Sequence, residues 1–326
     1  MTPTDSVLPL DWPALARLRH AFLAGSAGGH DYWQSERDLA SYDATFAQRI
    51  GWKWDHVLAD LARRGWQPPA GGLLDWGCGS GIAHRAFLDH FGTAGVSELR
   101  CWDRSPLAVN FALRRAVAKY PGLRAQAGLG EPPAVLLLSH VLSELQPAQT
   151  EELLKWLAPA TCVLWVEPGD YQTSLALIAI RERLRGQFQL VAPCPHQERC
   201  GILAPGNEPH WCHHFADPPG GIFTDPFWGK FARLAGVDLR SLPVSYLVLD
   251  QRPAPPLPPG AMRLIGRARL TKPYAHILGC DAVGVREAAV ARRDQPETYQ
   301  RLRKGRHGTA LTWECEGEKV VRLEGL

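Results

Sequence analysis

The chain has 326 residues, of which 45% are hydrophobic and 21% charged, and its formal net charge is +3 at pH 7. This composition is typical of a globular protein, and the length allows one large domain or two to three modules. The longest apolar run, around Ala134 to Leu138, is far shorter than the roughly 18 residues that span a bilayer, so we expect no membrane partner. The first residues include Asp5 and lack the pattern of a secretory or transit signal.

The N-terminal region, residues 1–68, is predicted to be helical. Apolar residues recur at three- and four-residue spacing over Trp12 to Leu23 and over Trp52 to Trp66. Gly25 to Gly29 is expected to break the first helix, and the prolines and glycines from Pro68 to Gly72 mark a boundary.

Short apolar runs and helical patterns alternate through residues 69–190. Strands are expected to end at Asp75 and to cover Glu98–Asp103, Ala134–Ser139 and Cys162–Glu167. Helices are expected at Ile82–Phe91, Pro106–Tyr120, Pro147–Leu157 and Thr173–Leu184. Such alternation predicts an α/β fold, a Rossmann-like core whose parallel sheet is covered on both faces.

Residues 191–251 are interpreted as a Cys-rich insertion followed by a return to the core. Pro193 to Gly221 has no periodicity, whereas Phe227–Leu234 suggests a helix and Ser245–Asp250 a strand.

Residues 252–326 are predicted to form a proline linker and a basic, β-rich C-terminal module. The linker is Arg252–Gly260, and the elements expected after it are strands at Met262–Leu270, Tyr274–Cys280 and Val283–Val290 and a helix at Pro296–Lys304. From Ala261 to Leu326 there are 13 Lys and Arg against 8 Asp and Glu, which favours a polyanionic partner.

The segment Leu73-Leu74-Asp75-Trp76-Gly77-Cys78-Gly79-Ser80-Gly81 resembles motif I of the class I methyltransferases. Asp75 ends a strand, and the glycines at 77, 79 and 81 permit a tight turn directly before a helix. Asp103, at the end of the next strand, is placed to accept the ribose hydroxyls of a nucleoside. A dinucleotide site requires G-x-G-x-x-G, and the D-x-G-x-G-x-G order found here favours S-adenosylmethionine over NAD.

Ser139 and His140 follow the strand that begins near Ala134, where such folds place cofactor and catalytic groups. We therefore predict that Ser139 contributes to the cofactor site. The Asn-Pro-Pro-Tyr motif of amino methyltransferases is absent, as is the cysteine loop of cytosine-C5 enzymes. No catalytic residue is assigned; His140 and Glu144 are candidates, and a structural role fits each of them equally well.

A second group of candidate site residues consists of the cysteines at positions 194, 200 and 212, which lie in a loop rich in Pro, Gly and His. Soft thiolates with nearby imidazoles indicate a metal site, although unrelated free thiols are the alternative. The spacing matches neither a zinc finger nor a ferredoxin. Candidates for the fourth ligand are Cys280, which we favour, and His196, His213 and His214.

Several stretches together resemble the mitochondrial small-ribosomal-subunit assembly methyltransferases (Rsm twenty-two and methyltransferase-like seventeen), a family with bacterial members. They are Ala192–His196, Trp211–His214, Ser245–Leu249, Ala275–Cys280, Glu167–Gly169 with Arg181, and the basic stretch Arg301–His307. The sequence departs from the family after Cys212, where Ala216–Gly221 replaces a basic stretch.

The resemblance implies that Cys194, Cys200, Cys212 and Cys280 hold a [4Fe-4S] cluster, whereas spacing alone leaves zinc open. It also implies a small-ribosomal-subunit partner with rRNA contact, and a location in the bacterial cytoplasm or the mitochondrial matrix. We assume a monomer.

Three functions fit these expectations: an S-adenosylmethionine-dependent rRNA methyltransferase, a non-catalytic assembly factor that uses the fold as a scaffold, and an iron–sulfur sensor. Trp211, Tyr274 and Tyr299 are candidates for stacking on rRNA bases, and core packing is the alternative for each.

Overall fold

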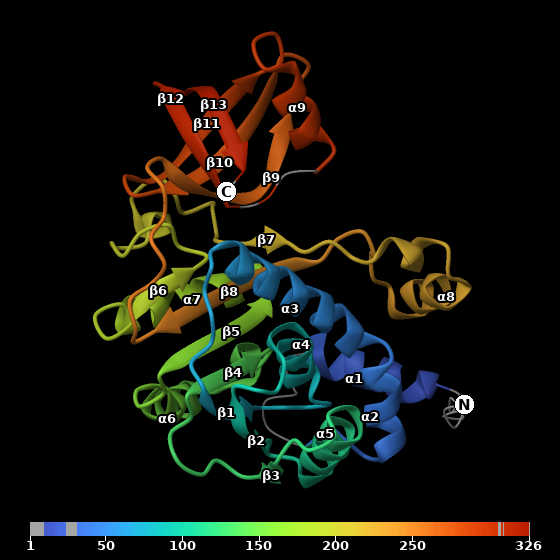
Figure 1. Ribbon diagram of the computed structural model, residues 1–326. Coiled ribbons are helices and arrows are strands. Elements are labelled where there is room, and N and C mark those ends of the chain that lie inside the picture. The colour runs from blue at the N-terminus through green and yellow to red at the C-terminus, as the bar shows by residue number, and fades with distance from the viewer. Residues whose placement is uncertain (1–9, 24–30, 306–307, 309, 326) are drawn as a thin grey trace.

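The computed structural model describes residues 10–23, 31–305, 308 and 310–325. Within these ranges a mixed sheet flanked by helices forms the larger body, and a small barrel made by the C-terminal strands stands beside it (Figure 1). The predicted break at Gly25 to Gly29 and the positions of Arg306 and His307 lie outside the described residues. None of the helices in the described ranges combines the length and apolarity that a membrane crossing needs.

Three helices precede the sheet. They are α1 (Trp12–Leu23), α2 (Glu36–Asp43) and α3 (Phe46–Arg63). The predicted helical character is confirmed, but α3 begins at Phe46 rather than at Trp52. Helix α2 falls within the region predicted to be helical, but its bounds were not predicted, because it is short and polar. It begins where the Ser35 hydroxyl accepts a hydrogen bond from the Asp38 amide.

The large sheet has the order β3-β2-β1-β4-β5-β8-β6, and β7 pairs with β8 off this path. Its strands are β1 (Gly71–Trp76), β2 (Val96–Trp102), β3 (Ala125–Ala127), β4 (Val135–Ser139), β5 (Cys162–Pro168), β6 (Gln189–Ala192), β7 (His214–Phe215) and β8 (Pro243–Asp250). Strands β1 to β5 are parallel, as predicted. Strand β8 runs antiparallel to β5 and β6, so the α/β sheet is mixed rather than wholly parallel.

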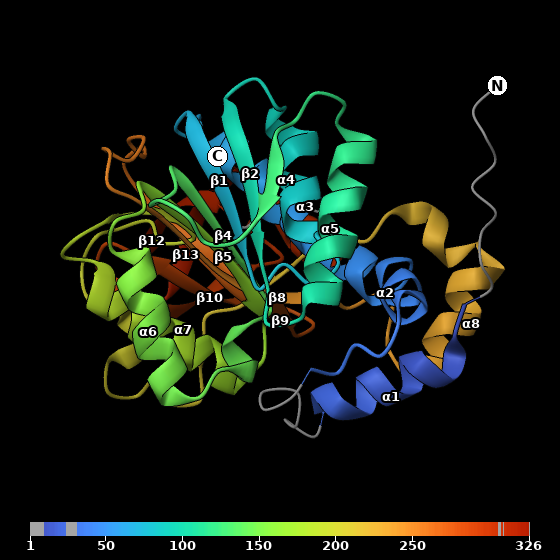
Figure 2. The same ribbon diagram turned by 90° about the horizontal axis from the view of Figure 1, so that it is seen from below.

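Helices cover both faces of this sheet (Figure 2). One face, which includes Leu73 and Leu137, packs on α3, α4 (Ile82–Phe91) and α5 (Pro106–Lys119). The other, which includes Leu74 and Leu138, packs on α6 (Pro147–Leu157) and α7 (Tyr171–Leu184). Because neighbouring residues of each central strand are buried on opposite faces, these strands are apolar throughout.

The segment between β6 and β8 is largely irregular, as expected, and it carries α8 (Pro226–Ala235). Trp228 and Phe231 of α8 belong to an apolar cluster with Trp12 and Phe46 of the N-terminal helices. The distal end of the insertion is thereby packed beside α1.

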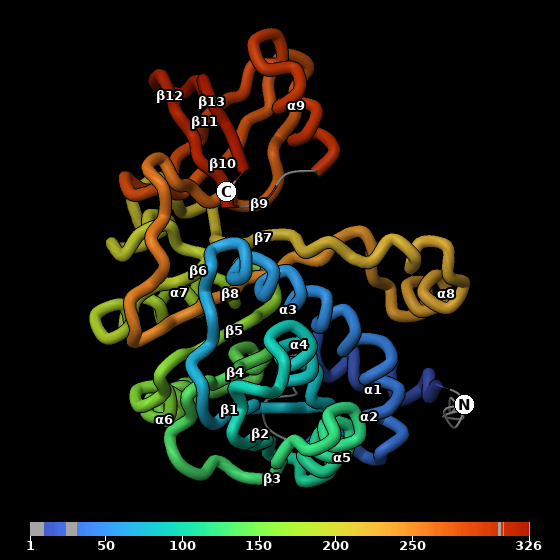
Figure 3. Tube along the Cα trace, in the orientation of Figure 1, coloured from blue at the N-terminus to red at the C-terminus, as the bar shows by residue number. Residues whose placement is uncertain are grey.

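The C-terminal strands close into a barrel of order β10-β11-β13-β12-β9. Its elements are β9 (Ala261–Leu270), β10 (Tyr274–Asp281), β11 (Gly284–Ala291), α9 (Pro296–Arg303), β12 (Ala310–Glu316) and β13 (Lys319–Gly325). The Cα trace in Figure 3 shows the preceding chain rising from the end of β8 to the barrel. A β-rich module was predicted, but β12 and β13 were not.

Candidate functional site

The glycine loop lies at the carboxyl end of β1. Gly77, Gly79 and Gly81 have φ values of 70°, 50° and 81°, a region that disfavours side chains. A Cβ at Gly81 would lie 2.4 Å from Cε1 of His84, and one at Gly77 would lie 2.6 Å from Cγ1 of Val141. The loop therefore requires glycine at these two positions for both conformation and space.

Asp75 lies beneath this loop and is fully buried. Its Oδ2 is 2.7 Å from Nδ1 of His84 and 3.4 Å from the His84 amide nitrogen. Burial alone would lower the pKa of His84, but the neighbouring Cys101 and Asp75 outweigh it and raise that pKa to about 9. Asp75 thus holds the first turn of α4 under the loop, a positioning contact within the protein.

Asp103 follows β2 and faces the loop. Its carboxylate accepts hydrogen bonds from the amides of Gly79 (2.9 Å) and Ser105 (3.0 Å). Burial raises the pKa of Asp103, and these two hydrogen bonds oppose the rise. The carboxylate retains acceptor capacity for hydroxyl groups.

A cavity of about 380 Å³ opens beside Asp103. Trp76 and Trp102 form part of its wall and stack with ring centroids 4.6 Å apart. Gly77 and Val141 also line it. An apolar wall next to a carboxylate suits a nucleoside, whose base is apolar on its faces and whose ribose is a hydrogen-bond donor.

A second cavity, of about 600 Å³, adjoins the first and shares Glu144 with it. Lys53, His140 and Asp170 also line it. The Glu144 carboxylate accepts from Arg104 at 2.8 Å and from the Tyr32 hydroxyl at 3.3 Å, and burial raises its pKa to about 7. The two predicted catalytic candidates, His140 and Glu144, therefore lie together at one cavity.

Lys53 was not predicted. Its Nζ lies 3.4 Å from Nε2 of His140. Lys53 is buried on α3, and His140, directly after β4, is partly buried. Burial lowers the pKa of Lys53 to about 7 and, together with the Lys53 charge, lowers the pKa of His140 well below its usual value. The signal was present in the sequence, since Lys53 stands between Ile50 and Val57 on the apolar stripe of α3.

Ser139 ends β4, but its hydroxyl accepts a hydrogen bond from Nε1 of Trp54 at 2.9 Å. This contact fastens α3 to the sheet. The residue after it, His140, has a φ of 56°, which is unusual for a side chain other than glycine. Its amide donates to the Val166 carbonyl at 2.9 Å, which keeps the turn at the cavity wall.

Glu167 at the end of β5 is a further buried carboxyl group that prediction did not single out as a site residue. Its Oε1 accepts from the amides of Val141 and Leu142, both at 3.0 Å, and from Nε1 of Trp165 at 2.6 Å. Burial raises its pKa to about 7. It supports the chain that carries His140 and Glu144.

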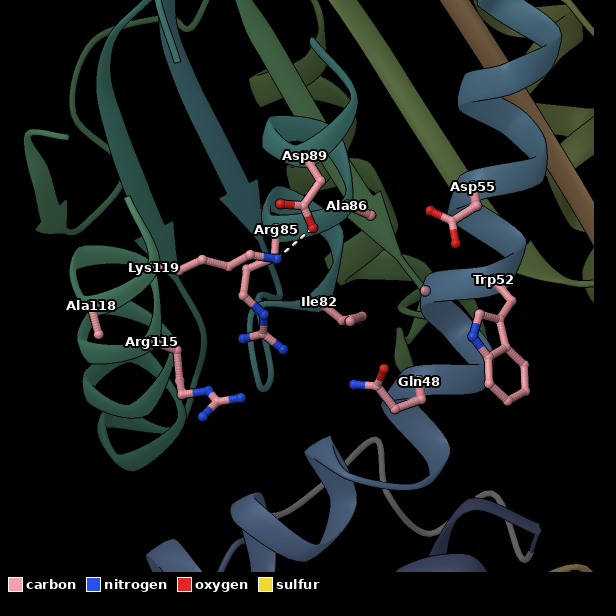
Figure 4. Close-up of a pocket in the computed structure, with 11 residues that line it drawn as sticks. Gln48, Trp52, Asp55, Ile82, Arg85, Ala86, Asp89, Arg115, Ala118 and Lys119 are labelled. Atoms are coloured by element: carbon pink, nitrogen blue, oxygen red, sulfur yellow. Dashed lines mark hydrogen bonds and ion pairs between the residues drawn. The ribbon is translucent and has the colours of Figure 1, made fainter. Parts of the chain in front are cut away.

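A third cavity, of about 470 Å³, lies among α3, α4 and α5 (Figure 4). Its basic residues are paired: Lys119 with Asp89, and both Arg85 and Arg115 with Asp43. It contains none of the predicted site residues.

The four predicted metal-ligating cysteines lie near one another, between the insertion and the barrel. Cys200, Cys212 and Cys280 belong to one small cluster with Ile178 and Ile265. A narrow cavity there is lined by Cys194, Cys200, Cys212 and Arg181.

Polar neighbours surround these thiols. Nε of Arg181 lies 3.2 Å from Sγ of Cys194, Nε2 of His196 lies 3.5 Å from Sγ of Cys280, and Nε2 of His214 lies 3.8 Å from Sγ of Cys212. The ring of His213 instead stacks on Trp211. Burial and the neighbouring thiols raise the pKa of Cys200 to about 11, and those of Cys212 and Cys280 are also raised. Among the described residues, no group of three or more His, Cys, Asp or Glu side chains meets the geometry of a metal site.

The model of one protein family, described as mitochondrial small ribosomal subunit Rsm22, matches residues 56–311 of the chain. The chain belongs to this family. The resemblance drawn from the cysteine and histidine stretches is thereby confirmed. No curated protein matches the chain.

Three solved structures illustrate the distant likeness in fold. A putative RNA methyltransferase from Pyrococcus horikoshii is 12% identical, with 72% of this chain and 98% of that chain covered and a TM-score of 0.37. The plantazolicin methyltransferase BpumL, solved with SAH, is 13% identical, with 74% and 100% covered and a TM-score of 0.39. The 16S rRNA methylase ArmA is 10% identical, with 74% and 100% covered and a TM-score of 0.37.

Proposed function

We propose that this Rsm22-family chain binds S-adenosylmethionine in a class I methyltransferase-like core and methylates rRNA of the small ribosomal subunit during assembly. The observation that carries the proposal is the cavity beside Asp103, framed by the glycine loop at the carboxyl edge of parallel strands. Ligands of open α/β sheets bind at this edge. Family membership supports the ribosomal substrate.

In this proposal Asp103 accepts the ribose hydroxyls, and Trp76 and Trp102 supply the apolar wall for the base. The bound cofactor supplies an electrophilic methyl group. The acceptor nucleotide occupies the adjoining cavity, where Glu144 and Lys53, each with a pKa of about 7, are able to hold the proton that the acceptor atom loses. His140, whose pKa is lowered, remains neutral beside them.

The test is transfer of tritiated methyl groups from S-adenosylmethionine to immature small subunits, with the wild type and with Asp103→Ala. We expect incorporation by the wild type and its loss in the variant. Asp89→Ala is the matched control, because Asp89 is a surface carboxylate paired with Lys119 outside the nucleoside cavity. Equal incorporation by wild type and Asp103→Ala would refute the assigned site.

A non-catalytic assembly factor is the second candidate. It is favoured by the sequence Ser139-His140-Val141-Leu142 at the position of the amino-methyltransferase motif, and by the use of the Ser139 hydroxyl to bind Trp54. Wild-type protein that binds immature subunits without transferring a methyl group would support this function instead.

We also propose that the four cysteines at positions 194, 200, 212 and 280 hold a [4Fe-4S] cluster. The donor set supports it: Cys194 is close enough to the other three thiols to raise their pKa values, and Arg181 lies beside them to offset the thiolate charge. Bound there, the cluster would join the insertion to β10 as a structural clasp. Protein purified anaerobically should show broad visible absorbance and contain iron, whereas a colourless, zinc-loaded protein would contradict the proposal.

If this proposal holds, the partner of the chain is the small ribosomal subunit with its rRNA. The chain would then act in the compartment where that subunit is assembled. We treat the chain as a monomer in this proposal.

A further inference from the structure

The barrel has a topology that is associated with nucleic-acid binding. Its first three strands, β9, β10 and β11, are antiparallel neighbours; α9 follows the third; and the fifth strand, β13, pairs in parallel with the third. Strand β12 closes the ring against β9. This is the arrangement of an OB-fold, which binds oligonucleotides on the face of its second and third strands and through the loops between strands one and two and between strands four and five.

The outer face of β10 can be followed in the register. Tyr274, His276, Leu278 and Cys280 alternate with Ala275 and Ile277, which are buried in the barrel core. Leu278 and Cys280 pack against the insertion in the cluster that includes Cys200. Half of this face is therefore covered by the cysteine site.

The other half of the face is open. Tyr274 is 44% exposed, and its ring lies 6.0 Å from that of His276. Opposite these residues on β11 stand Ala291 and Ala289, whose side chains are small. The His276 side chain is 25% exposed. Arg269 pairs with His276 in the register from β9, and its side chain is 65% exposed.

Both loops that serve OB-folds flank this open half. The loop between β9 and β10, residues 271–273, carries the exposed Lys272 two residues before Tyr274. The loop between β12 and β13 reaches the same end, because the Ala289 amide donates to the Glu318 carbonyl at 2.7 Å.

Of the three aromatic residues expected from the sequence to stack on RNA, Tyr274 alone is suited to it. Tyr299 is buried in the barrel core, where its hydroxyl donates to the Thr271 carbonyl at 2.7 Å. Trp211 stacks on His213 and donates from Nε1 to the Gly169 carbonyl at 3.0 Å. The prediction for these two residues is corrected to packing roles.

We infer that the open half of the outer barrel face, made by Tyr274, His276, Arg269 and Lys272, binds single-stranded RNA. The inference deepens the proposed function, because it names the form of RNA and the surface that receives it. Aromatic rings stack on unpaired bases, and cations follow the phosphates. The excess of 13 Lys and Arg over 8 Asp and Glu between Ala261 and Leu326 favours a polyanion over an oligosaccharide or an uncharged surface.

Carboxylates oppose this charge: Glu318 stands exposed on the β12–β13 loop, and Glu287 on β11 lies at the face itself. Glu287 accepts from Arg269 at 2.6 Å and lies 3.2 Å from Nδ1 of His276. Because it lies among the groups that would meet phosphates, its removal should strengthen RNA binding. If the face instead bound a basic or neutral protein, removal of Glu287 would weaken that binding or leave it unchanged.

The experiment measures binding of the full chain to a fluorescent uridine dodecamer, and to an RNA duplex of the same length, by fluorescence anisotropy. The double variant Tyr274→Ala/His276→Ala should weaken single-strand binding by on the order of tenfold or more. Tyr274→Phe should retain the wild-type affinity, since it keeps the ring. Glu287→Gln should bind the dodecamer severalfold more tightly. Arg269→Ala should reduce the magnitude of the slope of log binding constant against log salt concentration by about 0.7.

Two variants outside the face serve as controls. Phe223 is 53% exposed on the insertion, and Arg322 on β13 is 59% exposed and paired with Glu324, as Arg269 is paired with Glu287. Phe223→Ala and Arg322→Ala should bind as the wild type does. Thermal unfolding of every variant verifies that the barrel is folded.

The inference is overturned if the wild type does not bind the dodecamer, if it binds the duplex as tightly, or if the aromatic double variant binds normally. Titration with S-adenosylhomocysteine separates this outcome from failure of the proposed function. If the aromatic double variant still binds the cofactor but no longer binds RNA, the barrel face is responsible for RNA binding. If RNA binding is intact but no methyl group is transferred, only the catalytic proposal fails.

Discussion

Lys53 shows how a single charge on an apolar helix stripe marks a site. Its side chain is buried beside His140, and burial together with the nearby Arg49 lowers its pKa to about 7, although Glu167 and Asp170 favour the charged form. A buried cation without a close carboxylate partner destabilises the folded state. Such a cost is typical of residues that are retained for binding or catalysis.

The pH dependence of stability should report this cost. The unfolded chain keeps the Lys53 proton up to about pH 10.5, whereas the folded chain loses it above about pH 7. Between these values the unfolded state binds more protons, so this residue makes stability rise with pH, and its penalty is complete below pH 7. Lys53→Met should therefore be more stable than the wild type at pH 7, and the gap should narrow by up to about 1.4 kcal/mol per pH unit as pH rises.

Urea unfolding at several pH values between 7 and 10 measures the difference in free energy of unfolding between Lys53→Met and the wild type. Lys155→Met is the control, because Lys155 is exposed on α6 and pairs with Glu152 at the surface. Parallel stability curves for wild type and Lys53→Met would show that Lys53 titrates normally.

The glycine loop offers a second test at the scale of residues. Gly79 and Gly81 both have positive φ, but a Cβ at Gly79 meets nothing within 4 Å, whereas one at Gly81 meets His84. Gly79→Ala should cost about 1–2 kcal/mol of stability from the backbone alone, and Gly81→Ala clearly more. Urea unfolding compares the two variants. Equal losses would mean that the packing of His84 under the loop does not require this glycine.

Among the elements, the central strands were predictable and the barrel closure was not. Strands β4 and β5 are apolar at nearly every position because both faces are covered, and that pattern is visible in the sequence. Strands β12 and β13 carry charged residues on their outer face and are completed by pairing with β9 and β11 far along the chain. Local sequence does not encode such long-range pairing, so these two strands were missed.

The candidate site likewise has a part that the sequence predicts and a part that it does not. The glycine loop and Asp103 follow directly from consecutive strands, and their positions were predictable. The contact of Lys53 with His140, and that of Trp54 with Ser139, join α3 to a strand more than 80 residues later. These contacts depend on how α3 packs across the sheet, which the motif does not specify.

A buried ion pair joins α3 to the barrel. Nη2 of Arg263 on β9 lies 2.8 Å from Oδ2 of Asp60, the Tyr246 hydroxyl donates to the same oxygen, and both charged side chains are almost fully buried. Removing one partner leaves the other charge buried and unpaired. Asp60→Asn should therefore lower the free energy of unfolding by about 3–5 kcal/mol.

Urea unfolding of Asp60→Asn, Arg263→Met and their double variant tests this pair. The double variant should lose less than the sum of the two single losses. Arg269→Met, which removes a surface pair with Glu287, should cost less than about 1 kcal/mol. If Asp60→Asn were no more harmful than this surface change, the pair would not join the two bodies.

At the scale of the whole molecule, the cysteine site lies where three parts of the chain meet. Cys194 follows β6, Cys212 precedes β7, and Cys280 belongs to the barrel. If they share one cluster, Cys280→Ser should abolish it as completely as Cys194→Ser. Cys315→Ser is the control, because Cys315 packs against the barrel core instead.

Iron content and visible absorbance of anaerobically purified protein measure this outcome. Retention of the cluster in Cys280→Ser would break the proposed connection between the insertion and the barrel. Loss of the cluster in all three variants would indicate general destabilisation rather than ligation.

Binding of a nucleoside cofactor at the glycine loop is measured by calorimetric titration with S-adenosylhomocysteine. We expect saturable binding by the wild type, its loss in Asp103→Ala, and its retention in Asp89→Ala. Absence of binding to the wild type, or unchanged binding to Asp103→Ala, would contradict this expectation.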